Sequence, residues 1–332
     1  MSTKQGGLRM TPQKRLLLTS GRSHPELAAE VAQHLGAELS PVSAYDFANG
    51  EIFVRFDESV RGCDVFILQS HTSPINKWLM EQLIMVDAAR RASAKRITIV
   101  CPFLGYARQD KKHRGREPIT ARLVLDMFTR AGADRVMTVD LHTSQIQGFF
   151  DGPVDHLFAL PLLTGHVARR YAGEPITVVS PDAGRVRVAE RWTDRLGSPL
   201  AIIHKRRDPD VPNQVKVFEV VGDVKDRLCV VVDDMIDTGG TIAKASETLF
   251  ENGAKDVVVA ATHGILSDPA PQRLEEAGIA EVIVTNTLPI PEDRRFEHLT
   301  VLSIAPMLAQ AIEEVFSDGS VTSLFDEPKS DI

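Results

Sequence analysis

The chain alternates short, mostly apolar runs with longer stretches in which apolar residues recur every three or four positions. In the first half the short runs are RLLLTS, DVFILQS, RITIVCPFL and RVMTVDLH, and in the second half they are ITVVSPD, PLAIIHK, RLCVVVDD, DVVVAATHG and EVIVTNT. The stretches between them, such as PELAAEVAQHLG and PITARLVLDMFTRAG, have helical spacing. β-Branched runs that alternate with helices are typical of parallel sheets covered on both faces. We therefore predict an α/β fold.

The same order of patterns occurs twice. The first half contains DVFILQS, a helical stretch and then ASAKRITIV. The second half has the same order, with CVVVDD, a helical stretch and then NGAKDVVVA. Such repetition predicts two similar domains, each with a mostly parallel sheet flanked by helices. We place them at residues 14–160 and 161–317, with the boundary near Pro161, and expect residues 318–326 to pack back on the first domain. LTVLSIAPMLAQAIEEVF is expected to form a last strand and helix, and both chain ends are expected to fray.

Composition narrows the class of protein. The formal net charge of the 332 residues is −7 at pH 7, so general affinity for nucleic acids is not expected, and an anion site needs Lys and Arg gathered locally. Cys63, Cys101 and Cys229 lie in or beside apolar runs, without the spacing of metal ligands. No signal peptide or membrane-length apolar segment is evident. We expect a cytoplasmic protein with reduced core cysteines and no membrane partner.

The stretch VVVDDMIDTGGTI, residues 230–242, carries the clearest chemistry. Its apolar run predicts a buried strand, and the helical pattern that follows makes it a strand, a loop and a helix. A helix N-terminus offers free N–H groups to a phosphate, and the glycines allow close approach. The carboxylates of Asp233, Asp234 and Asp237 suit vicinal hydroxyls. The loop therefore predicts a sugar-phosphate site, against the alternative of an acidic turn in an ordinary α/β unit.

Two basic segments also follow strands. GYARQDKKHRGREPIT and AIIHKRRDPDVPNQVKV are expected to bind anions, because ligands of α/β sheets bind at the carboxyl ends of strands; the alternative for each is a solvated surface loop. Their cations are Arg108, Lys111, Lys112, Arg114 and Arg116 in the first, and Lys205, Arg206 and Arg207 in the second. The second segment has the pattern of a hairpin with cations at its root, and such cations stabilise phosphoryl transfer.

Two further strand ends carry potential metal ligands. His142 is the last residue of RVMTVDLH, and Asp182 is the last residue of ITVVSPD. Mg²⁺ prefers oxygen donors, so Asp182 suits it together with phosphate oxygens and water. A histidine at a strand end is more often structural, and His142 as a direct ligand stays one of two interpretations.

Taken together, these segments resemble the ribose-phosphate pyrophosphokinase family, the phosphoribosyl diphosphate synthetases, in its phosphate-activated class. The resemblance runs from FANGE at Phe47 to SVTSLF near the C-terminus. VVVDDMIDTGGT is similar to a ribose 5-phosphate loop that this family shares with phosphoribosyltransferases, whereas VDLHTSQIQGFFDGPVD is similar to a signature of the synthetases. The resemblance implies two phosphoribosyltransferase-like domains, the first on the ATP side and the second on the ribose 5-phosphate side.

The resemblance also implies roles for individual residues. It implies that ribose 5-phosphate is bound by Asp233, Asp234, Asp237, Thr238, Gly239, Gly240 and Thr241. It implies that ATP is bound by Arg108 and Gln109, together with Phe47, Asn49 and Glu51 of a neighbouring subunit, and that His142 and Asp182 bind Mg²⁺-ATP. It further implies that Lys205 and Arg207 act on the transferred group. It implies a homo-oligomer, commonly a hexamer. A regulatory site for phosphate as activator and ADP as inhibitor would involve Ser59, Arg61, Arg116, Gln147, Asp155, Ser320, Val321 and Thr322.

The implied reaction is attack of the C1 hydroxyl of ribose 5-phosphate on the β-phosphorus of Mg-ATP, giving phosphoribosyl diphosphate (PRPP) and AMP for nucleotide biosynthesis. Two positions depart from the family pattern: His113 replaces an acidic residue, and Arg185-Val186-Arg187 replaces a Gly-Val-Lys-type stretch. These bear on the binding of the nucleotide ribose, not on the reaction class. One alternative is a phosphoribosyltransferase, which the two similar domains make less favourable. The other is an inactive regulatory homologue, which the intact pentose loop and the intact Lys205 to Arg207 segment make less favourable.

Overall fold

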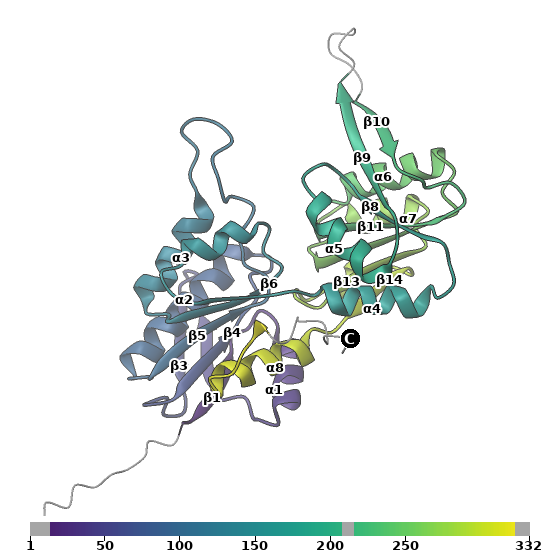
Figure 1. Ribbon diagram of the computed structural model, residues 1–332. Helices are drawn as coiled ribbons and strands as arrows, with labels where there is room; N and C mark the ends of the chain where they lie inside the picture. Colours follow the sequence, from purple (N-terminus) through teal and green to yellow (C-terminus); the bar gives the residue numbers. More distant parts are fainter. Residues whose placement is uncertain (1–13, 208–215, 323–332) are drawn as a thin grey trace, which may run out of the picture.

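The structure, a computed structural model, describes residues 14–207 and 216–322, and the side chains of residues 205–218 lie outside that description. Figure 1 shows two units side by side. The elements of the first are β1 (Leu16–Ser20), α1 (Pro25–Leu35), β2 (Val42–Asp46), β3 (Ile52–Phe56), β4 (Asp64–Leu68), α2 (Ile75–Arg91), β5 (Arg96–Cys101), α3 (Thr120–Ala131), β6 (Arg135–Val139), the 3₁₀ helix η1 (Ser144–Phe149) and β7 (Val154–Leu157).

The second unit follows directly along the chain. Its elements are α4 (Leu160–Arg170), β8 (Ile176–Ser180), α5 (Val186–Leu196), β9 (Leu200–Arg207), β10 (Lys216–Val221), β11 (Leu228–Ile236), α6 (Gly240–Glu251), β12 (Asp256–Gly264), α7 (Ala270–Glu276), β13 (Glu281–Thr285), the 3₁₀ helix η2 (Glu292–Arg294) and β14 (Leu299–Leu302). The last helix, α8 (Ala305–Phe316), returns to the first unit and lies beside α1 in Figure 1.

The strand order confirms the predicted similarity of the two units. The first sheet has the order β1-β4-β5-β6-β7, and the second contains β8-β11-β12-β13-β14 in the corresponding sequence of neighbours. All of these pairs are parallel. Each unit also has a hairpin after its first strand: β2–β3 forms a separate two-stranded sheet, whereas β9–β10 adds to the edge of the second sheet. All nine apolar runs named from the sequence are strands.

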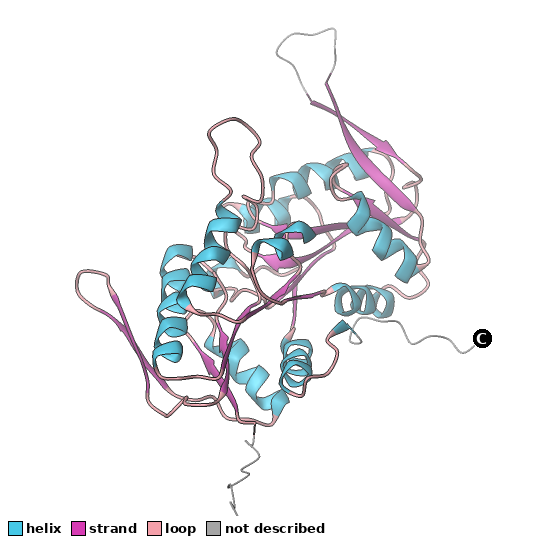
Figure 2. Ribbon diagram, turned by 60° about the vertical axis from the view of Figure 1, so that its left-hand side comes forward, coloured by secondary structure: helices cyan, strands magenta, loops and turns pink. Residues whose placement is uncertain are grey.

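Helices cover both faces of each sheet, as Figure 2 shows, because the strands are apolar on both sides. In β11 eight of nine residues are buried. Residues of α2 and α3 pack on one face of the first sheet, and those of α6 and α7 on one face of the second. The opposite faces share one continuous core, to which α1, α4, α5 and α8 contribute. This shared core joins the two units, because it contains residues from the strands of both sheets. At its end the chain returns to the first unit, where α8 packs against α1 (Figure 1).

The segment after α8 touches the first unit through Asp318. Its carboxylate forms ion pairs with Lys14 and Arg96, the latter over 3.3 Å. Residues 323–326 of the expected C-terminal contact lie outside the described residues. The domain boundary at Pro161 stays a prediction. Cys63, Cys101 and Cys229 are buried free thiols, as expected.

The carboxyl ends of strands from both sheets meet between the units. Asp140, just after β6, accepts hydrogen bonds from Thr262 Oγ1 in β12 over 2.6 Å and from the Ala159 amide over 2.9 Å. His263 Nε2 lies 3.1 Å from the Asp140 carbonyl oxygen, and Ser70, just after β4, donates to the Thr287 carbonyl. Because ligands of α/β sheets bind at this edge, the junction places the binding regions of both units against each other. Within the described ranges, no helix is long and apolar enough to cross a membrane.

Candidate active site

The predicted pentose loop begins inside a strand and ends on a helix. Asp233 and Asp234 belong to β11, which continues to Ile236, and the turn that follows leads into α6 at Gly240. Gly239 is the N-cap residue of α6 with φ of 71°, a left-handed conformation that glycine adopts without strain. The twelve residues of α6 point their N-terminus at the loop, so that free backbone N–H groups and the positive end of the helix dipole face an anion there.

The two adjacent carboxylates are held by side chains from other segments. Arg185 Nε lies 2.9 Å from Asp233 Oδ1, and Arg185 Nη2 lies 2.7 Å from Asp234 Oδ1. His142 Nδ1, from the first unit, lies 2.8 Å from Asp234 Oδ2. The same nitrogen is 2.9 Å from Arg185 Nη2, so it can either donate to the carboxylate or accept from the guanidinium. The acidic pair is therefore the centre of a cluster that joins both units.

Burial and neighbouring charges shift the pKa values of Asp233 and Asp234 in opposite directions. Burial together with the charge of Asp234 raises the pKa of Asp233 to about 8, against the opposing charge of Arg185. Burial would also raise the pKa of Asp234, but the hydrogen bond from His142 and the charge of Arg185 outweigh it and lower that pKa to about 2. Asp234 thus holds the negative charge near neutral pH, and Asp233 retains a proton over much of the range.

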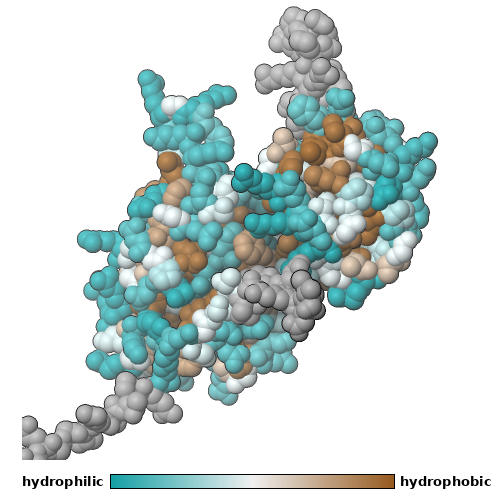
Figure 3. All heavy atoms as spheres, in the orientation of Figure 1, coloured by the Kyte–Doolittle hydropathy of each residue, from teal (hydrophilic) through white to brown (hydrophobic). Residues whose placement is uncertain are grey.

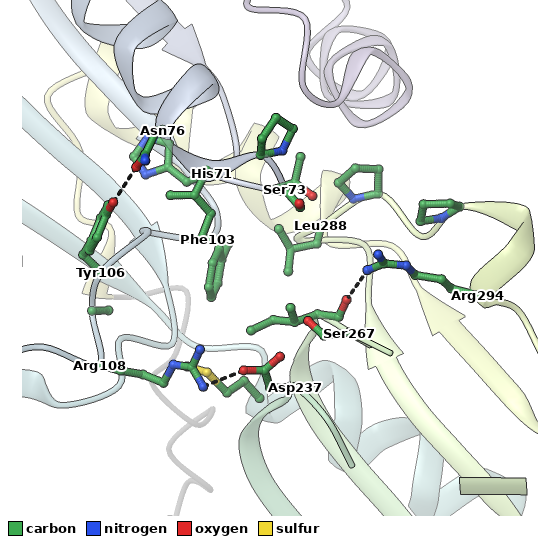
Figure 4. Close-up of a pocket in the computed structure, with 18 of the residues that line it drawn as sticks. His71, Ser73, Asn76, Phe103, Tyr106, Arg108, Asp237, Ser267, Leu288 and Arg294 are labelled. Atoms are coloured by element: carbon green, nitrogen blue, oxygen red, sulfur yellow. Dashed lines mark hydrogen bonds and ion pairs between the residues drawn. The ribbon is translucent and has the colours of Figure 1, made fainter. Parts of the chain in front are cut away.

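Two cavities meet at the loop. One, of about 250 Å³, is lined by residues 233–242 together with Arg108, His142 and Arg185. The other, of about 600 Å³, lies between the units. The first unit lines it with residues 71–76, Phe103 and residues 106–109, and the second unit lines it with Met235, Asp237, Ile265, Ser267, Leu288, Pro289, Pro291 and Arg294. Figure 4 shows the side chains of the larger cavity. Both cavities share Arg108 and Asp237, so two ligands bound there would be neighbours.

An ion pair crosses from one unit to the other at this point. Arg108 Nη1 lies 2.8 Å from Asp237 Oδ2, as the dashed line in Figure 4 shows. Gln109 Oε1 accepts a hydrogen bond from Thr120 Oγ1 over 2.6 Å, just inside α3. The arginine expected to hold ATP and the aspartate expected to hold ribose 5-phosphate are thus in direct contact. The spacing of the two motifs along the chain gave no signal of this contact.

The basic loop that contains Arg108 projects from the first unit, and its residues 111–116 are exposed. It stands clear of the molecule in Figures 1 and 3, where it is hydrophilic. Asp110 fixes its root by accepting from Thr143 Oγ1 over 2.6 Å and Gln145 Nε2 over 2.7 Å. The Glu117 carboxylate accepts from the backbone amides of His113 and Arg114. The root is thus ordered by hydrogen bonds while the lysines and arginines face solvent.

The β9–β10 hairpin rises on the same side of the molecule in Figure 1. Lys205 and Arg207 belong to β9, where their backbones pair with Phe218 and Lys216. Their side chains lie outside the described residues, so their catalytic role stays a prediction.

The residues expected to hold Mg²⁺ lie at two strand ends. Asp182 Oδ1 accepts from the Gly184 amide over 2.8 Å, just after β8. His142 uses Nδ1 toward Asp234 and Arg185, so a metal contact would have to come from Nε2. Among the described residues no three His, Cys, Asp or Glu side chains gather as a metal cage. This donor set suits Mg²⁺ bound mainly by substrate phosphates and water, with one or two protein ligands.

The residues expected to line the adenine site lie apart from these cavities. Phe47, Asn49 and Glu51 are exposed on the turn between β2 and β3, and none of them lines either cavity. The Phe47 amide donates to the Glu51 carbonyl over 2.8 Å, and the ring packs edge to face on Tyr45. This turn is therefore a preformed, exposed feature of the first unit.

The expected regulatory residues make local contacts in this chain. Ser59, Arg61 and Arg116 are exposed, and Ser320, Val321 and Thr322 follow α8. Gln147 Nε2 donates to the Ser144 carbonyl, and Asp155 pairs with Arg135 Nη1 over 2.8 Å. Their regulatory role stays a prediction.

Arg185 is a site residue that the sequence did not assign to the pentose loop. Arg185 was connected with the nucleotide, whereas the structure places it on Asp233 and Asp234. Asp140 lines neither cavity, but it joins the two units through Thr262 and His263, and its φ of 37° is a left-handed conformation that is uncommon for a non-glycine residue. The signal for Asp140 in the sequence was its position at the end of a strand, two residues before His142.

Two family models and several curated relatives that match this chain carry ribose-phosphate pyrophosphokinase or phosphoribosyl synthetase descriptions. One family model, described as the N-terminal domain of ribose phosphate pyrophosphokinase, matches residues 16–132, and another, the phosphoribosyl synthetase-associated domain, matches residues 209–326. A curated relative from Streptomyces coelicolor, named ribose-phosphate pyrophosphokinase, is 65% identical over 97% of this chain and 99% of its own length. One of the same name from Bifidobacterium longum is 61% identical over 95% of this chain and 94% of its own.

A solved structure agrees with these relatives. The crystal structure of phosphoribosylpyrophosphate synthetase from Mycobacterium smegmatis superposes with a TM-score of 0.88 at 65% sequence identity, and the match covers 92% of this chain and 100% of that one. The relatives that are 61–65% identical over nearly the full chain carry the pyrophosphokinase or synthetase name, so the transferase alternative is not favoured.

Proposed function

The chain belongs to the ribose-phosphate pyrophosphokinase family, and from that premise we propose that it transfers the β,γ-diphosphoryl group of ATP to the C1 hydroxyl of ribose 5-phosphate. The products are phosphoribosyl diphosphate and AMP. One observation supports this best: the pentose loop and the Arg108 turn line adjoining cavities and are joined by the 2.8 Å contact between Arg108 and Asp237. A transfer between two bound anions needs this proximity.

The pentose side is the loop from Asp233 to Thr241. The 5-phosphate would accept hydrogen bonds from backbone N–H groups of residues 237–241 at the N-terminus of α6. The ring hydroxyls would donate to the carboxylates of Asp233 and Asp234, which leaves C1 directed toward the first unit. Gly239 allows the backbone to approach the phosphate closely.

The nucleotide side is the Arg108–Gln109 turn of the first unit. A neighbouring subunit would cover the adenine with Phe47, Asn49 and Glu51, whose exposure on the β2–β3 turn suits such a contact. The active enzyme is then a homo-oligomer, which we propose to be a hexamer in the cytoplasm. Phosphate as activator and ADP as inhibitor would bind at a subunit interface.

Mg²⁺ would be held by Asp182 and His142 Nε2 together with phosphate oxygens, and when bound it neutralises charge on the triphosphate and polarises it. The chain's own residues position the reactants. The C1 oxygen bonds to the β-phosphorus, the bond from that phosphorus to the oxygen bridging to the α-phosphate breaks, and AMP leaves with that oxygen. The C1 hydroxyl proton passes to solvent. Lys205 and Arg207 would stabilise the charge on the transferred group.

Phosphorus NMR of the purified protein tests this proposal. The protein would be incubated with ribose 5-phosphate, Mg²⁺ and ATP in phosphate buffer. We expect AMP to accumulate in step with a diphosphate attached to ribose C1. Accumulation of ADP would indicate an ordinary kinase, and no turnover would favour the inactive homologue.

A further inference from the structure

Arg185 is the cation in closest contact with the pentose-side acids, although it comes from a different part of the chain. It caps the N-terminus of α5 in the loop after β8, and β8 is the sheet neighbour of β11, which carries Asp233 and Asp234. The side chain of Arg185 is 16% exposed and lines the smaller cavity beside the pentose loop. The fold thus delivers a mostly buried guanidinium to the place where the ring hydroxyls of the pentose are expected.

The guanidinium is engaged on three of its nitrogens. Nε and Nη2 pair with Asp233 Oδ1 and Asp234 Oδ1 over 2.9 and 2.7 Å, and Nη1 donates to the carbonyl oxygen of His142 over 3.2 Å. A planar fork that binds two carboxylates fixes both of them in orientation. The contact to the His142 carbonyl also links this pair to the first unit.

A neutral sugar cannot replace this cation. The side chains of Asp233 and Asp234 are only 17% and 6% exposed, and the buried negative charge held by Asp234 is strongly unfavourable without a cation. Ribose hydroxyls can donate hydrogen bonds to the acids but bring no positive charge. Arg185 must therefore stay on at least one carboxylate when the pentose binds, and the sugar must bind to a carboxylate pair that Arg185 has already oriented.

We propose that Arg185 is a positioning residue of the pentose site, which holds Asp233 and Asp234 in place to accept the ring hydroxyls of ribose 5-phosphate and remains there in the bound state. This inference rests on the proposed function, because it takes ribose 5-phosphate as the ligand. The opposite role, in which Arg185 fills the empty site and must leave, makes the opposite prediction for affinity. The two roles can thus be distinguished by the sign of one change.

The test compares Arg185→Gln, which keeps most of the size and removes the charge, with Arg185→Lys, which keeps the charge and removes the fork. Arg187→Gln is the matched control, since Arg187 is exposed on α5 two residues further on. Thermal unfolding of each variant identifies any loss of folding. Calorimetric titration with ribose 5-phosphate would be made on the oligomeric protein, alone and with Mg²⁺ and α,β-methylene-ATP, and the analogue would be titrated separately.

We expect Arg185→Gln to weaken binding of ribose 5-phosphate by about tenfold or more, from the loss of the two ion pairs that orient the acids. Arg185→Lys should lie between it and the wild type, Arg187→Gln should match the wild type, and the affinity for the ATP analogue should change by less than about threefold. In turnover the KM for ribose 5-phosphate should rise more than kcat falls.

Tighter binding of ribose 5-phosphate by Arg185→Gln would show that Arg185 obstructs the site, and an unchanged affinity would show that it does not act there. An equal loss for the ATP analogue would make it a nucleotide contact. Each of these results overturns the inference while leaving the proposed function intact. If Arg185→Gln does not fold, Arg185→Lys decides by the same criteria. Failure of the wild-type protein to bind ribose 5-phosphate in either condition would instead overturn the proposed function, and this inference with it.

Discussion

Replacing the two adjacent acids one at a time tests how charge is distributed in the pentose site. Asp233→Asn and Asp234→Asn are the same chemical change one residue apart on β11. The structure predicts different results, because Asp234 contacts both His142 and Arg185, whereas Asp233 contacts only Arg185 of these two side chains. The experiment is made without Mg²⁺ or substrates, so that the protein's own groups set the energies.

The contacts give the size of the difference. Asp234 is ionised near neutral pH, and its replacement removes a charge from one hydrogen bond and one ion pair that are almost buried. Hydrogen bonds to charged groups each contribute about 1.5–3 kcal/mol, and breaking a buried ion pair costs about 3–5 kcal/mol. We expect Asp234→Asn to lower the free energy of unfolding by about 3 kcal/mol. Asp233 is largely protonated at pH 7 in the folded protein but ionised in the unfolded chain, so Asp233→Asn should not lower the free energy of unfolding and should raise it by up to about 4 kcal/mol.

The raised pKa of Asp233 also predicts how the stability difference between Asp233→Asn and the wild type changes with pH. The pKa of Asp233 is raised to about 8 in the folded protein from about 3.9 in the unfolded chain. Between these values the folded state binds more protons than the unfolded state, so stability falls as pH rises through the window. Asp233→Asn removes this titration. The variant should therefore gain stability relative to the wild type on going from about pH 5 to about pH 8.

Urea unfolding at those two pH values measures both effects, with the linear dependence on urea giving the free energies. An equal loss of stability from the two variants would refute the assignment of charge to Asp234. So would a larger loss from Asp233→Asn, or a pH dependence of Asp233→Asn identical to that of the wild type. A change in the urea slope for one variant alone would show that the replacement altered the compactness of the folded or unfolded state or broke two-state unfolding, and its free energy would then not report the charge on the site.

Two further predictions separate catalysis from stability. Lys205→Ala should lower turnover by a few orders of magnitude with little change in the affinity for ribose 5-phosphate, measured by steady-state kinetics and titration; an equal loss of affinity would make Lys205 a binding residue. Glu281, at the amino end of β13, accepts from His166, Tyr171 and Thr300, so Glu281→Gln should lower the free energy of unfolding by about 2 kcal/mol and leave both KM values unchanged. A changed KM would contradict this purely structural role.

The sequence predicted the sheets because their strands are long, apolar and buried on both faces. It did not reveal β7, of four residues, or β2 and β3, whose residues are only partly buried or exposed. Such short strands carry no continuous apolar run, and their pairing depends on neighbours distant in sequence. Element type was thus predictable where an apolar run was continuous, including the edge strand β14, and was missed where the run was short or interrupted by polar residues.

The site was predicted in its parts but not in its assembly. The Asp-Asp-x-x-Asp-Thr-Gly-Gly-Thr loop was evident because its chemistry is contiguous in sequence. Arg185 was not assigned to it, since the contact depends on β8 and β11 being neighbours in the sheet although about fifty residues separate Arg185 from the acids. The contact of Arg108 with Asp237 likewise depends on how the two units meet. Strand order and domain contact are tertiary properties that periodicity does not encode.

Comparison of the two units predicts one pentose site for each chain, although the fold is duplicated. By strand order β4 corresponds to β11, so the segment after β4, residues 69–74, corresponds to the pentose loop. That segment has no carboxylate and no glycine. Its polar side chains serve the packing of the protein: Ser70 donates to the Thr287 carbonyl, and His71 bonds Gln82 and accepts from the Gly105 amide.

Burial lowers the pKa of His71 to about 4, so it carries no positive charge near neutral pH and cannot attract a phosphate. Titration with ribose 5-phosphate in the presence of Mg²⁺ and α,β-methylene-ATP should therefore saturate at one equivalent per chain. Replacement of Asp237 by Asn should weaken that single event without revealing a second. Saturation at two equivalents would show that the first unit has kept a pentose site, and the division of the duplicated fold into one nucleotide side and one pentose side would then be wrong.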